Sequence, residues 1–381
     1  MKRQFNHFLF HSGAIFFLAV FLNVFGILFL ATLSAPASLR QFDSTNYYLL
    51  HQILFGLLPA LVLGFIAFKT PLHIIKKIAP WLFLLNILAL AFVFLPFFGS
   101  RFWGAKRWLN LGFTTIQPSE FLKITAILYL SAWISSRISE QNHRGWIPAA
   151  KNGYHNFIYI LLPFLVFLGL ISTILILQPD VSTLGVISLT LVVIYFSAKT
   201  PIWHAIAVIS GGMGALLLLI KFEPYRLDRL LIFLHPESDP LGKGWQIKQS
   251  MIALGSGGFF GKGLGMSSQK FGHLPAAMTD SIFAILGEEL GIIGSVGLII
   301  LFFLFFWLGL KIAKSANDRF SKLTAIGVTT WITLQAFINM ASAIGIFPLA
   351  GIPLPFFSYG GSHIVTELIG IGLLLNISKN S

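Results

Sequence analysis

Apolar runs of about 20 residues recur along the whole chain, and each is long enough to cross a bilayer as a helix. Hydrophobic residues make up 56% of the sequence and charged residues only 10%, so little polar surface remains for a separate soluble domain. We therefore predict an all-α, polytopic membrane protein that forms a single domain over residues 1–381. About ten spans are expected, at residues 8–33, 47–68, 78–98, 118–136, 155–177, 181–198, 201–222, 280–311, 323–347 and 361–378.

The ends of several spans are marked in the sequence. The first apolar run, residues 8–33, is longer than the apolar core of a signal peptide, so we expect it to remain as the first span. Pro118, Pro201 and the run Thr279-Asp280-Ser281 indicate helix starts, because proline and short polar residues favour those positions. The chain contains no cysteine, which excludes disulfides, thiolate metal sites and cysteine nucleophiles.

The Lys and Arg residues of the loops predict how the chain crosses the membrane. With the longest loop left aside, they are much more frequent in loops on the side of the N-terminus than in loops on the other side. Positive charge gathers on the cytoplasmic side, so both termini are predicted to lie there. The two richest polar segments, about 99–117 and 223–279, are then extracytoplasmic, and the second is a large loop between helices 7 and 8. The basic residues of these two segments lie on the side where positive charge is usually scarce, which suggests that they bind a ligand.

The net charge of +13 would suit a nucleic-acid-binding protein, but here it is spread over short loops between apolar spans. That distribution indicates anionic lipid headgroups and phosphates as partners, and nucleic acid is not expected. The inner loops are short and lack a nucleotide-binding signature, so cytoplasmic ATP chemistry is not expected either.

Charged residues around the fourth span are candidates for substrate binding. Lys106 and Arg107 stand between two tryptophans, a pattern that suits either a ligand site or an ordinary interfacial anchor. Glu120 and Lys123 lie three residues apart in the first turns of a span, on one helix face where they can pair. Ionisable residues inside a membrane helix usually line a polar cavity.

The turn Gln178-Pro179-Asp180 adds another carboxylate. We interpret Asp180 first as a helix cap in a tight turn. The functional alternative is a half-buried carboxylate in the same cavity, with Lys123 as its cationic partner.

The predicted outer loop contains Arg229, Gln249 and the glycine-rich run Gly255–Gly265, followed by Lys270. Such a run can turn successive backbone N–H groups toward an anion, and Lys262 within it adds charge, so pyrophosphate binding is a candidate role. A P-loop is excluded, because glycine follows the lysine where serine or threonine is needed. A flexible turn is the structural alternative.

Asp280 is the strongest candidate for a reactive group. Thr279-Asp280-Ser281 before an apolar run is typical of a helix N-cap, and a helix N-terminus stabilises an ionised carboxylate that can accept a proton. Capping and catalysis are therefore compatible. Glu288 and Glu289 follow on the same helix, roughly 80° and 180° around it and about 12–13 Å along it. They cannot form a close pair with Asp280.

The segment Pro348–Ser362 combines several prolines with Ser358, Ser362 and a Gly-Gly pair. Its prolines force extended backbone, so a structural turn is the default interpretation and lining a cavity is the alternative. A serine-hydrolase elbow is excluded, because Phe356 stands two residues before Ser358 where glycine is needed.

Taken together, these motifs resemble the SEDS family (shape, elongation, division and sporulation), which includes the FtsW and RodA proteins. The resemblance covers nearly the whole chain, in the order of the family's motifs: Gly104–Trp108, Gln117–Lys123, Gln178–Asp180, Tyr225–Arg229, Gln249–Gly265, Leu274–Gly291 and Pro348–Ser362. The chain departs from the family pattern at Ser182, Ala276, Ser281 and His363. The run Met266–Lys270 favours an FtsW-like over a RodA-like member by a small margin.

The resemblance implies a peptidoglycan glycosyltransferase of the bacterial plasma membrane that polymerises lipid II at the outer face, for septal or lateral wall synthesis. It also implies a class B penicillin-binding protein and other divisome or elongasome membrane proteins as partners. The family's catalytic carboxylate corresponds to Asp280, and Arg107, Glu120, Lys123 and Asp180 correspond to groove residues.

In the mechanism we expect, Asp280 is a single general base in one displacement, so the enzyme inverts the anomeric carbon and forms a β-1,4 link. Arg107, Lys123 and Lys262 would neutralise the departing pyrophosphate. Outer carboxylates with a pyrophosphate also suit a divalent cation, Mg²⁺ or Mn²⁺, although no spacing in the chain requires one.

Two other classes of function remain open. Charged residues within spans suit a lipid II flippase, but a transporter needs substrate groups on both faces, and this chain concentrates its polar motifs outside. A non-catalytic division scaffold would leave Asp280 as a helix cap only.

Overall fold

The computed structural model describes residues 2–95, 99–102, 105–110, 112, 114–143, 156–201, 203–222, 231–239 and 242–380, most of them in helices. The helices are α1 (Lys2–Phe42), α2 (Tyr47–His51), α3 (Leu58–Lys69), α4 (Leu72–Phe92), α5 (Pro118–His143), α7 (Leu162–Leu177), α8 (Val181–Ser197), α9 (Trp203–Phe222), α11 (Lys243–Gly257), α12 (Ile282–Ser315), α13 (Arg319–Ala343) and α14 (Gly361–Lys379). Each predicted span coincides with a helix. In the described part of the chain, seven helices are long and apolar enough to cross a bilayer. The prediction of an all-α, polytopic membrane protein is confirmed.

Short helical turns complete these elements. The π-helical turns Gln52–Leu57 and Phe157–Leu161 lead into α3 and α7, and the 3-10 turns Pro236–Ser238 and Gln269–Phe271 flank α11.

Some helix boundaries differ from the predicted ones. Helix α4 begins six residues before the predicted start, directly after Pro71, because proline fixes the backbone for entry into a helix. Helix α13 begins at Arg319, where Asp318 Oδ2 accepts a hydrogen bond from Ser321 N at 3.0 Å. It ends before Gly345, whose positive φ of 71° does not continue a helix.

The chain divides into two compact units, each built from three separate stretches. The first unit contains Met1–Phe65, Leu218–Leu308 and Ile332–Ile371, and the second contains Ile66–Leu217, Gly309–Trp331 and Gly372–Ser381. The single domain over residues 1–381 stays a prediction.

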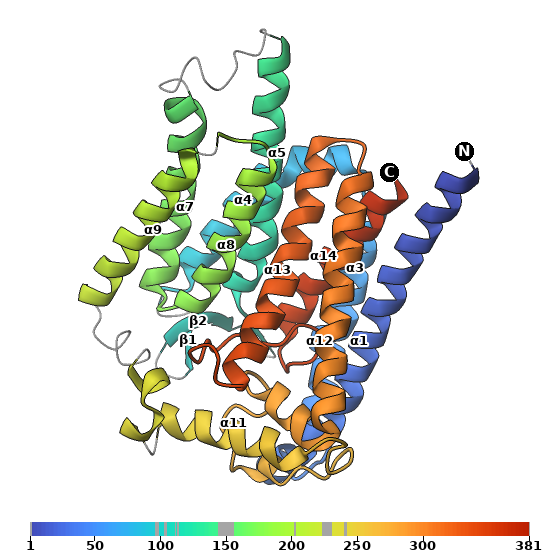
Figure 1. Ribbon diagram of the computed structural model, residues 1–381, viewed down its shortest axis with the longest axis vertical. Helices are drawn as coiled ribbons and strands as arrows, with labels where there is room; N and C mark the ends of the chain where they lie inside the picture. The colour runs from blue at the N-terminus through green and yellow to red at the C-terminus, as the bar shows by residue number, and fades with distance from the viewer. Residues whose placement is uncertain are drawn as a thin grey trace. The chain divides into compact units, whose positions relative to one another are not determined.

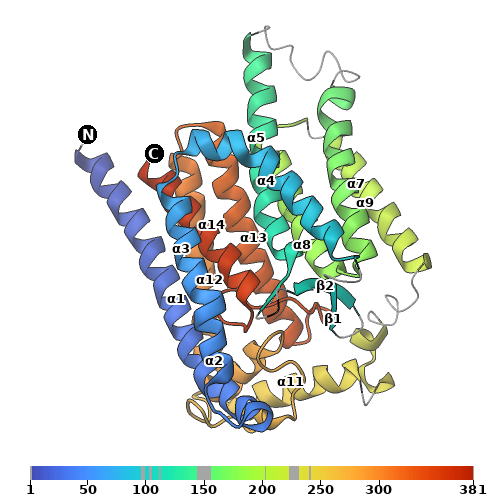
Figure 2. The ribbon, with the colours of Figure 1, turned by 180° about the vertical axis from the view of Figure 1, so that it is seen from behind.

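In the first unit, α1 runs beside α2 and the start of α3 (Figure 2). Glycines allow close packing here: a side chain at Gly26 would clash with Phe356 O, and one at Gly64 would lie 2.7 Å from Leu368 O. The contact at Gly26 brings Phe356, which lies within the predicted segment Pro348–Ser362, against the first helix.

In the second unit, α4 packs against α5, and both α5 and α7 pack against α8 (Figure 1). Phe83, Tyr129 and Phe167, one from each of α4, α5 and α7, pack against one another with ring centroids 5.0–5.1 Å apart. Aromatic contacts of this kind add stability beyond the apolar area that they bury.

The predicted polar segment 99–117 contains a small antiparallel sheet of strands β1 (Gly99–Phe102), β2 (Ala105–Asn110) and β3 (Thr115–Ile116), in that order. Gly99 pairs with Leu109, and Asn110 pairs with Thr115. Sequence reasoning did not predict this sheet. Strand β2 contains Lys106 and Arg107, so the pairing of the strands holds the backbone at both residues.

Candidate active site

Asp280 lies half-buried in the first unit, in the turn that leads into α12. The carbonyl of Ser281 accepts the first hydrogen bond of this helix, from Ala284 N at 3.0 Å. Ser281 therefore occupies the N-cap position, and Asp280 stands one residue outside the helix. The alternative in which Asp280 is only the helix cap is not what the backbone shows.

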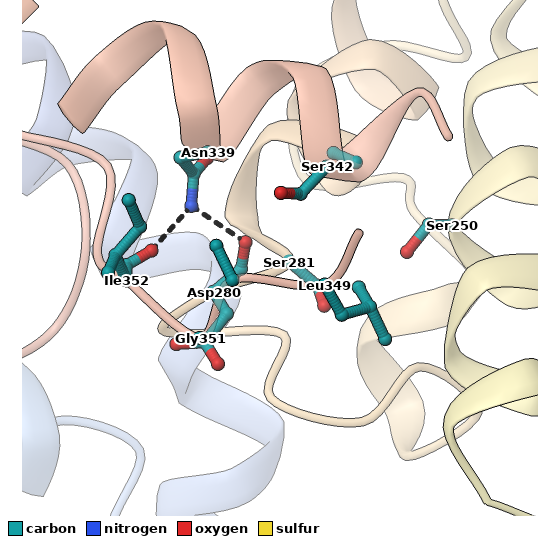
Figure 3. Close-up of a pocket in the computed structure, with 10 residues that line it drawn as sticks. Ser250, Asp280, Ser281, Asn339, Ser342, Leu349, Gly351 and Ile352 are labelled. Atoms are coloured by element: carbon teal, nitrogen blue, oxygen red, sulfur yellow. Dashed lines mark hydrogen bonds between the residues drawn. The ribbon is translucent and has the colours of Figure 1, made fainter. Parts of the chain in front are cut away.

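The Asp280 pocket is a small pocket lined by Ser250, Asp280, Ser281, Asn339, Ser342, Ala343, Leu349, Ala350, Gly351 and Ile352 (Figure 3). Gly351 has φ +63°, and a Cβ at this position would lie 3.6 Å from Asp280 Oδ2. Glycine is favoured here because it adopts this backbone conformation without strain and leaves the space beside the carboxylate open.

The backbone before Asp280 is held by the turn before α14. Ser358 Oγ donates to Thr279 O at 2.6 Å and accepts a bond from Leu354 N at 2.8 Å, while Tyr359 N donates to Met278 O at 2.8 Å. Burial raises the pKa of the Tyr359 hydroxyl above its ordinary value, so this group stays neutral.

Ser358 and Ser362 were predicted to bind substrate. Ser358 is buried and its hydroxyl is engaged in two bonds within the chain, so the structure gives it a structural role beside Asp280. Ser362 lies half-buried in the first turn of α14. Gln249 is buried on α11, next to the pocket residue Ser250. Substrate contacts of Ser362 and Gln249 stay predictions.

The glycine-rich run fills a break in α12. Gly291 interrupts this helix with φ 67° and ψ −164°. Ile292 N and Ile293 N donate to Gly258 O and Phe259 O at 2.9 and 3.3 Å instead of to the preceding turn of the helix. The two carbonyls left free, those of Glu288 and Glu289, accept bonds from Lys262 N and Gly263 N, both at 3.0 Å. Backbone groups in a membrane protein need such partners, so the loop repairs the break.

The same loop surrounds two buried carboxylates. Glu288 accepts bonds from Lys262 Nζ at 2.7 Å and from Ser268 Oγ at 2.9 Å. Glu289 accepts a bond from Gly265 N at 2.8 Å and lies 3.5 Å from Lys270 Nζ. The anions that this glycine-rich run holds are therefore carboxylates of the chain itself. In the structure the run has a defined set of hydrogen-bond partners within the chain.

Lys262 and Lys270 were predicted to meet a pyrophosphate. Lys270 is 5% exposed in its ion pair with Glu289, whereas the Lys262 side chain is 36% exposed beside Glu288. Of the two ammonium groups, that of Lys262 is the one with surface left for a ligand.

Replacing Gly261 with alanine is expected to break this arrangement. The new methyl group would clash with Glu289 O, and the residue already has φ +80°, which costs of order 1–3 kcal/mol for a non-glycine residue. Gly258→Ala is the control, because its φ is also positive but no neighbouring atom lies within 4 Å of the new methyl group. The thermal midpoint should fall clearly further for Gly261→Ala than for Gly258→Ala. Equal falls would contradict the close contact between the glycine-rich run and α12.

In the second unit, Arg107 binds the turn that precedes α8. Its Nε donates to Gln178 O at 3.1 Å, its Nη2 donates to Pro179 O, and Nη1 lies 3.8 Å from Asp180 Oδ1. Asp180 is buried and accepts a second bond, from Ser119 Oγ at 2.9 Å. Arg107 is thus a described cationic partner of Asp180, where sequence reasoning expected Lys123.

Glu120 and Lys123 form the predicted pair. Lys123 Nζ lies 2.7 Å from Glu120 Oε2, both side chains are buried, and the ammonium lies 5.4 Å from the ring centroid of Trp331. Lys123 and Trp331 also line a second, mostly apolar pocket with Ile127, Ile187, Thr190 and Leu191. Buried ionisable residues on a membrane helix usually line a polar cavity.

The remaining predicted residues are placed as follows. Lys106 is half-buried on β2, and Arg229 lies outside the described residues. Lys106, Arg107, Glu120, Lys123 and Asp180 belong to the second unit, whereas Asp280 belongs to the first. A common groove for all of them stays a prediction.

Arg107→Lys is expected to loosen the turn before α8. A lysine ammonium cannot make the forked set of bonds that the guanidinium makes to Gln178 O and Pro179 O, and a bond to a charged group contributes about 1.5–3 kcal/mol. The thermal midpoint should fall for Arg107→Lys and change little for Lys106→Arg, its neighbour on β2. Equal thermal midpoints for Arg107→Lys and the unaltered protein would show that these guanidinium hydrogen bonds do not hold the turn.

Most residues that line the pocket, Asn339 among them, were not singled out from the sequence, whereas Gly351 lies within the segment Pro348–Ser362, for which lining a cavity was the alternative interpretation. A signal for Asn339 was present, because an amide inside a membrane span usually faces a cavity or a polar partner. Within the described ranges, His, Asp and Glu side chains do not gather in groups of three that could hold a metal ion. The Mg²⁺ or Mn²⁺ suggested by the sequence remains a prediction.

Comparisons with known proteins find relatives over nearly the whole chain. The family model of the FtsW, RodA and SpoVE proteins, described as "Cell cycle protein", matches residues 13–381. A protein of Trichlorobacter lovleyi named "Probable peptidoglycan glycosyltransferase FtsW" is 35% identical, over 95% of this chain and 91% of its own length. The protein of the same name from Coxiella burnetii is 36% identical, over 93% of this chain and 92% of its own length. Stage V sporulation protein E of Bacillus subtilis is 34% identical over 96% of both chains.

Solved structures show the same fold. A chain of a peptidoglycan synthase complex, described as coordinating polymerization and crosslinking, has a TM-score of 0.74 at 25% identity and covers 96% of this chain and 97% of its own. The rod shape determining protein RodA of Thermus thermophilus has a TM-score of 0.68 at 23% identity, over 96% of both chains. With residues 13–381 matched by the family model and relatives more than 30% identical over nearly their full length, the chain belongs to the SEDS family of FtsW, RodA and SpoVE proteins.

Proposed function

We propose that this protein is an inverting peptidoglycan glycosyltransferase that polymerises lipid II at the outer face of the bacterial plasma membrane. The names of its FtsW relatives support the activity, and the helices long enough to cross a bilayer support a multi-pass membrane protein. The family description "Cell cycle protein" supports a role in cell division.

The observation that carries the proposal is the position of Asp280. Its carboxylate borders a pocket, its oxygen Oδ2 faces the open side of Gly351, and it stands one residue outside the N-terminal end of α12. The partial positive charge of a helix N-terminus favours the ionised form, which is the form that accepts a proton. A half-buried carboxylate in this place suits a general base.

In the reaction, Asp280 removes the proton from the 4-hydroxyl of a GlcNAc on one lipid-linked saccharide. The oxygen attacks the anomeric carbon of a second saccharide, a C–O bond forms, and the bond to undecaprenyl pyrophosphate breaks with its electron pair on the leaving group. Attack from the opposite face inverts the anomeric carbon and gives the β-1,4 link. A pyrophosphate leaves without protonation, so no second carboxylate is needed, unlike in glycosidases.

The cations of the second unit would bind the charged part of the substrate. Arg107 is held by the turn before α8 and presents a fixed positive charge, whereas the charge of Lys123 is paired with Glu120. Preorganised cations stabilise charge that develops on a leaving group. The exposed part of Lys262, which belongs to the first unit, would add another positive charge.

A transpeptidase is the partner that this proposal requires. The structural relative described as coordinating polymerization and crosslinking belongs to a synthase complex, which supports a class B penicillin-binding protein as the partner here. The glycan strands made by this protein would be its substrate.

Incubation of the purified protein with lipid II, alone and with a class B penicillin-binding protein, tests the proposal. Glycan chains resolved on a gel are the expected result. Movement of lipid II between the leaflets of vesicles without any polymer would instead indicate a flippase and refute the enzyme.

A further inference from the structure

Asn339, on α13, joins the two backbone segments that border the Asp280 pocket. Its Nδ2 donates to Asp280 O at 2.9 Å and to Ile352 O at 2.8 Å (Figure 3). Asp280 belongs to the turn before α12, and Ile352 belongs to the loop that follows α13. A single carboxamide therefore holds both walls of the pocket to one helix.

One polar atom of this buried side chain has no partner in the part of the chain that the structure describes. Asn339 is 2% exposed, and its Oδ1 has no hydrogen-bond partner among the described residues. A buried oxygen without a partner is destabilising, and such atoms are rare in folded proteins. The side chain nevertheless uses its amide hydrogens on two particular carbonyls, one of which belongs to Asp280.

We propose that Asn339 is a positioning residue for Asp280, an inference that rests on the proposed function. Its bond to Asp280 O fixes the peptide between Asp280 and Ser281, and so sets the direction in which the carboxylate leaves the backbone. Its bond to Ile352 O fixes the neighbour of Gly351, the residue whose open side faces Asp280 Oδ2. A shift of about 1 Å in a reacting group can lower a rate by about 10²-fold.

Gln335 provides a matched control within the same unit. It lies one turn earlier on α13, is 1% exposed, and its Nε2 donates to Pro353 O at 3.0 Å. Its carboxamide thus bonds the same loop one residue further along, whereas that of Asn339 also bonds Asp280. Loss of either amide should destabilise the loop to a similar degree, but only Asn339 should act through the base.

The test compares Asn339→Leu, which keeps the number and branching of the side-chain heavy atoms and removes the donor, with Gln335→Leu. Polymerisation of lipid II by each purified protein would be measured over a range of substrate concentrations, together with the thermal midpoint. We expect kcat of Asn339→Leu to fall about tenfold or more with KM unchanged within about twofold. For Gln335→Leu we expect kcat within about threefold of the unaltered protein at a comparable midpoint. Asn339→Ala, which is smaller and has no side-chain donor, serves as the second variant where Asn339→Leu does not fold.

The proposal is overturned by a normal kcat for the Asn339 variants, by an equal loss of kcat for Gln335→Leu, or by a loss confined to KM. Failure of the proposed function looks different, because it gives an unaltered protein that makes no polymer or an Asp280→Asn protein that still makes it. An active unaltered protein, an inactive Asp280→Asn protein and a normal Asn339→Leu protein together overturn the positioning role alone.

Discussion

Replacing Asp280 with asparagine is expected to abolish glycan synthesis while the protein still folds. The amide has almost the shape of the carboxylate but cannot accept the proton of the attacking hydroxyl. Loss of a general base typically lowers a rate by about 10²–10⁴-fold. The side chain is half-buried at the pocket and stands outside α12, so its replacement should cost the helix little stability. Polymer on a gel, at matched protein concentrations, is the measurement.

Two further variants make this result specific. Asp43→Asn changes an exposed carboxylate of the same unit, after the end of α1, and should leave the rate unchanged. Asp280→Glu keeps the charge but moves it by one methylene group, so it should retain a small part of the activity. Full activity of purified Asp280→Asn protein would remove Asp280 from the mechanism and leave the pocket without a base.

The second large effect is expected at Glu289, and it concerns stability. Glu289→Gln leaves Lys270, which is 5% exposed, as a buried ammonium without its carboxylate. Breaking a buried ion pair in this way costs roughly 3–5 kcal/mol, since the remaining charge is no longer compensated. The loop that repairs the break in α12 also loses the carboxylate that accepts a bond from Gly265 N. We expect a large fall in the thermal midpoint, with activity lost as a consequence.

The partners of this network separate the effect of charge from that of packing. Glu289→Gln combined with Lys270→Met removes both charges and should recover part of the lost midpoint, because no unpaired ammonium remains. Lys262→Met should cost less than Lys270→Met, since the Lys262 side chain is 36% exposed and more easily solvated. A Glu289→Gln protein as stable as the unaltered one would show that the ion pair does not hold the loop.

Much of the fold could be predicted from local patterns. Each predicted span is a helix because an apolar run in lipid must satisfy its own backbone hydrogen bonds, and a helix does so within one segment. The Glu120–Lys123 pair was also predictable from a local pattern, since both partners lie on one helix face. Helix α11 was missed because it lies in a polar, glycine-containing segment without a long apolar run.

Contacts between distant segments could not be predicted in this way. Asp180 was expected to meet Lys123, but Arg107 reaches it from a strand that local patterns did not indicate. Glu288 and Glu289 were recognised as unable to pair with Asp280, yet their partners in the glycine-rich run were not found. Sequence spacing gives the direction of a side chain on its own helix and nothing about the loop that folds back onto it.

The sequence by itself determined a polytopic helical protein, the family motifs and Asp280 as the candidate base, because apolar length, motif order and the helix-start pattern are local properties. Only the tertiary structure decided that Ser281 takes the cap position, that Ser358 holds the backbone beside Asp280, and that the glycine-rich run closes a break in α12. It also decided that Asn339 donates a hydrogen bond to the carbonyl of Asp280. These features depend on hydrogen bonds between segments far apart in the chain, which form only when the segments pack together.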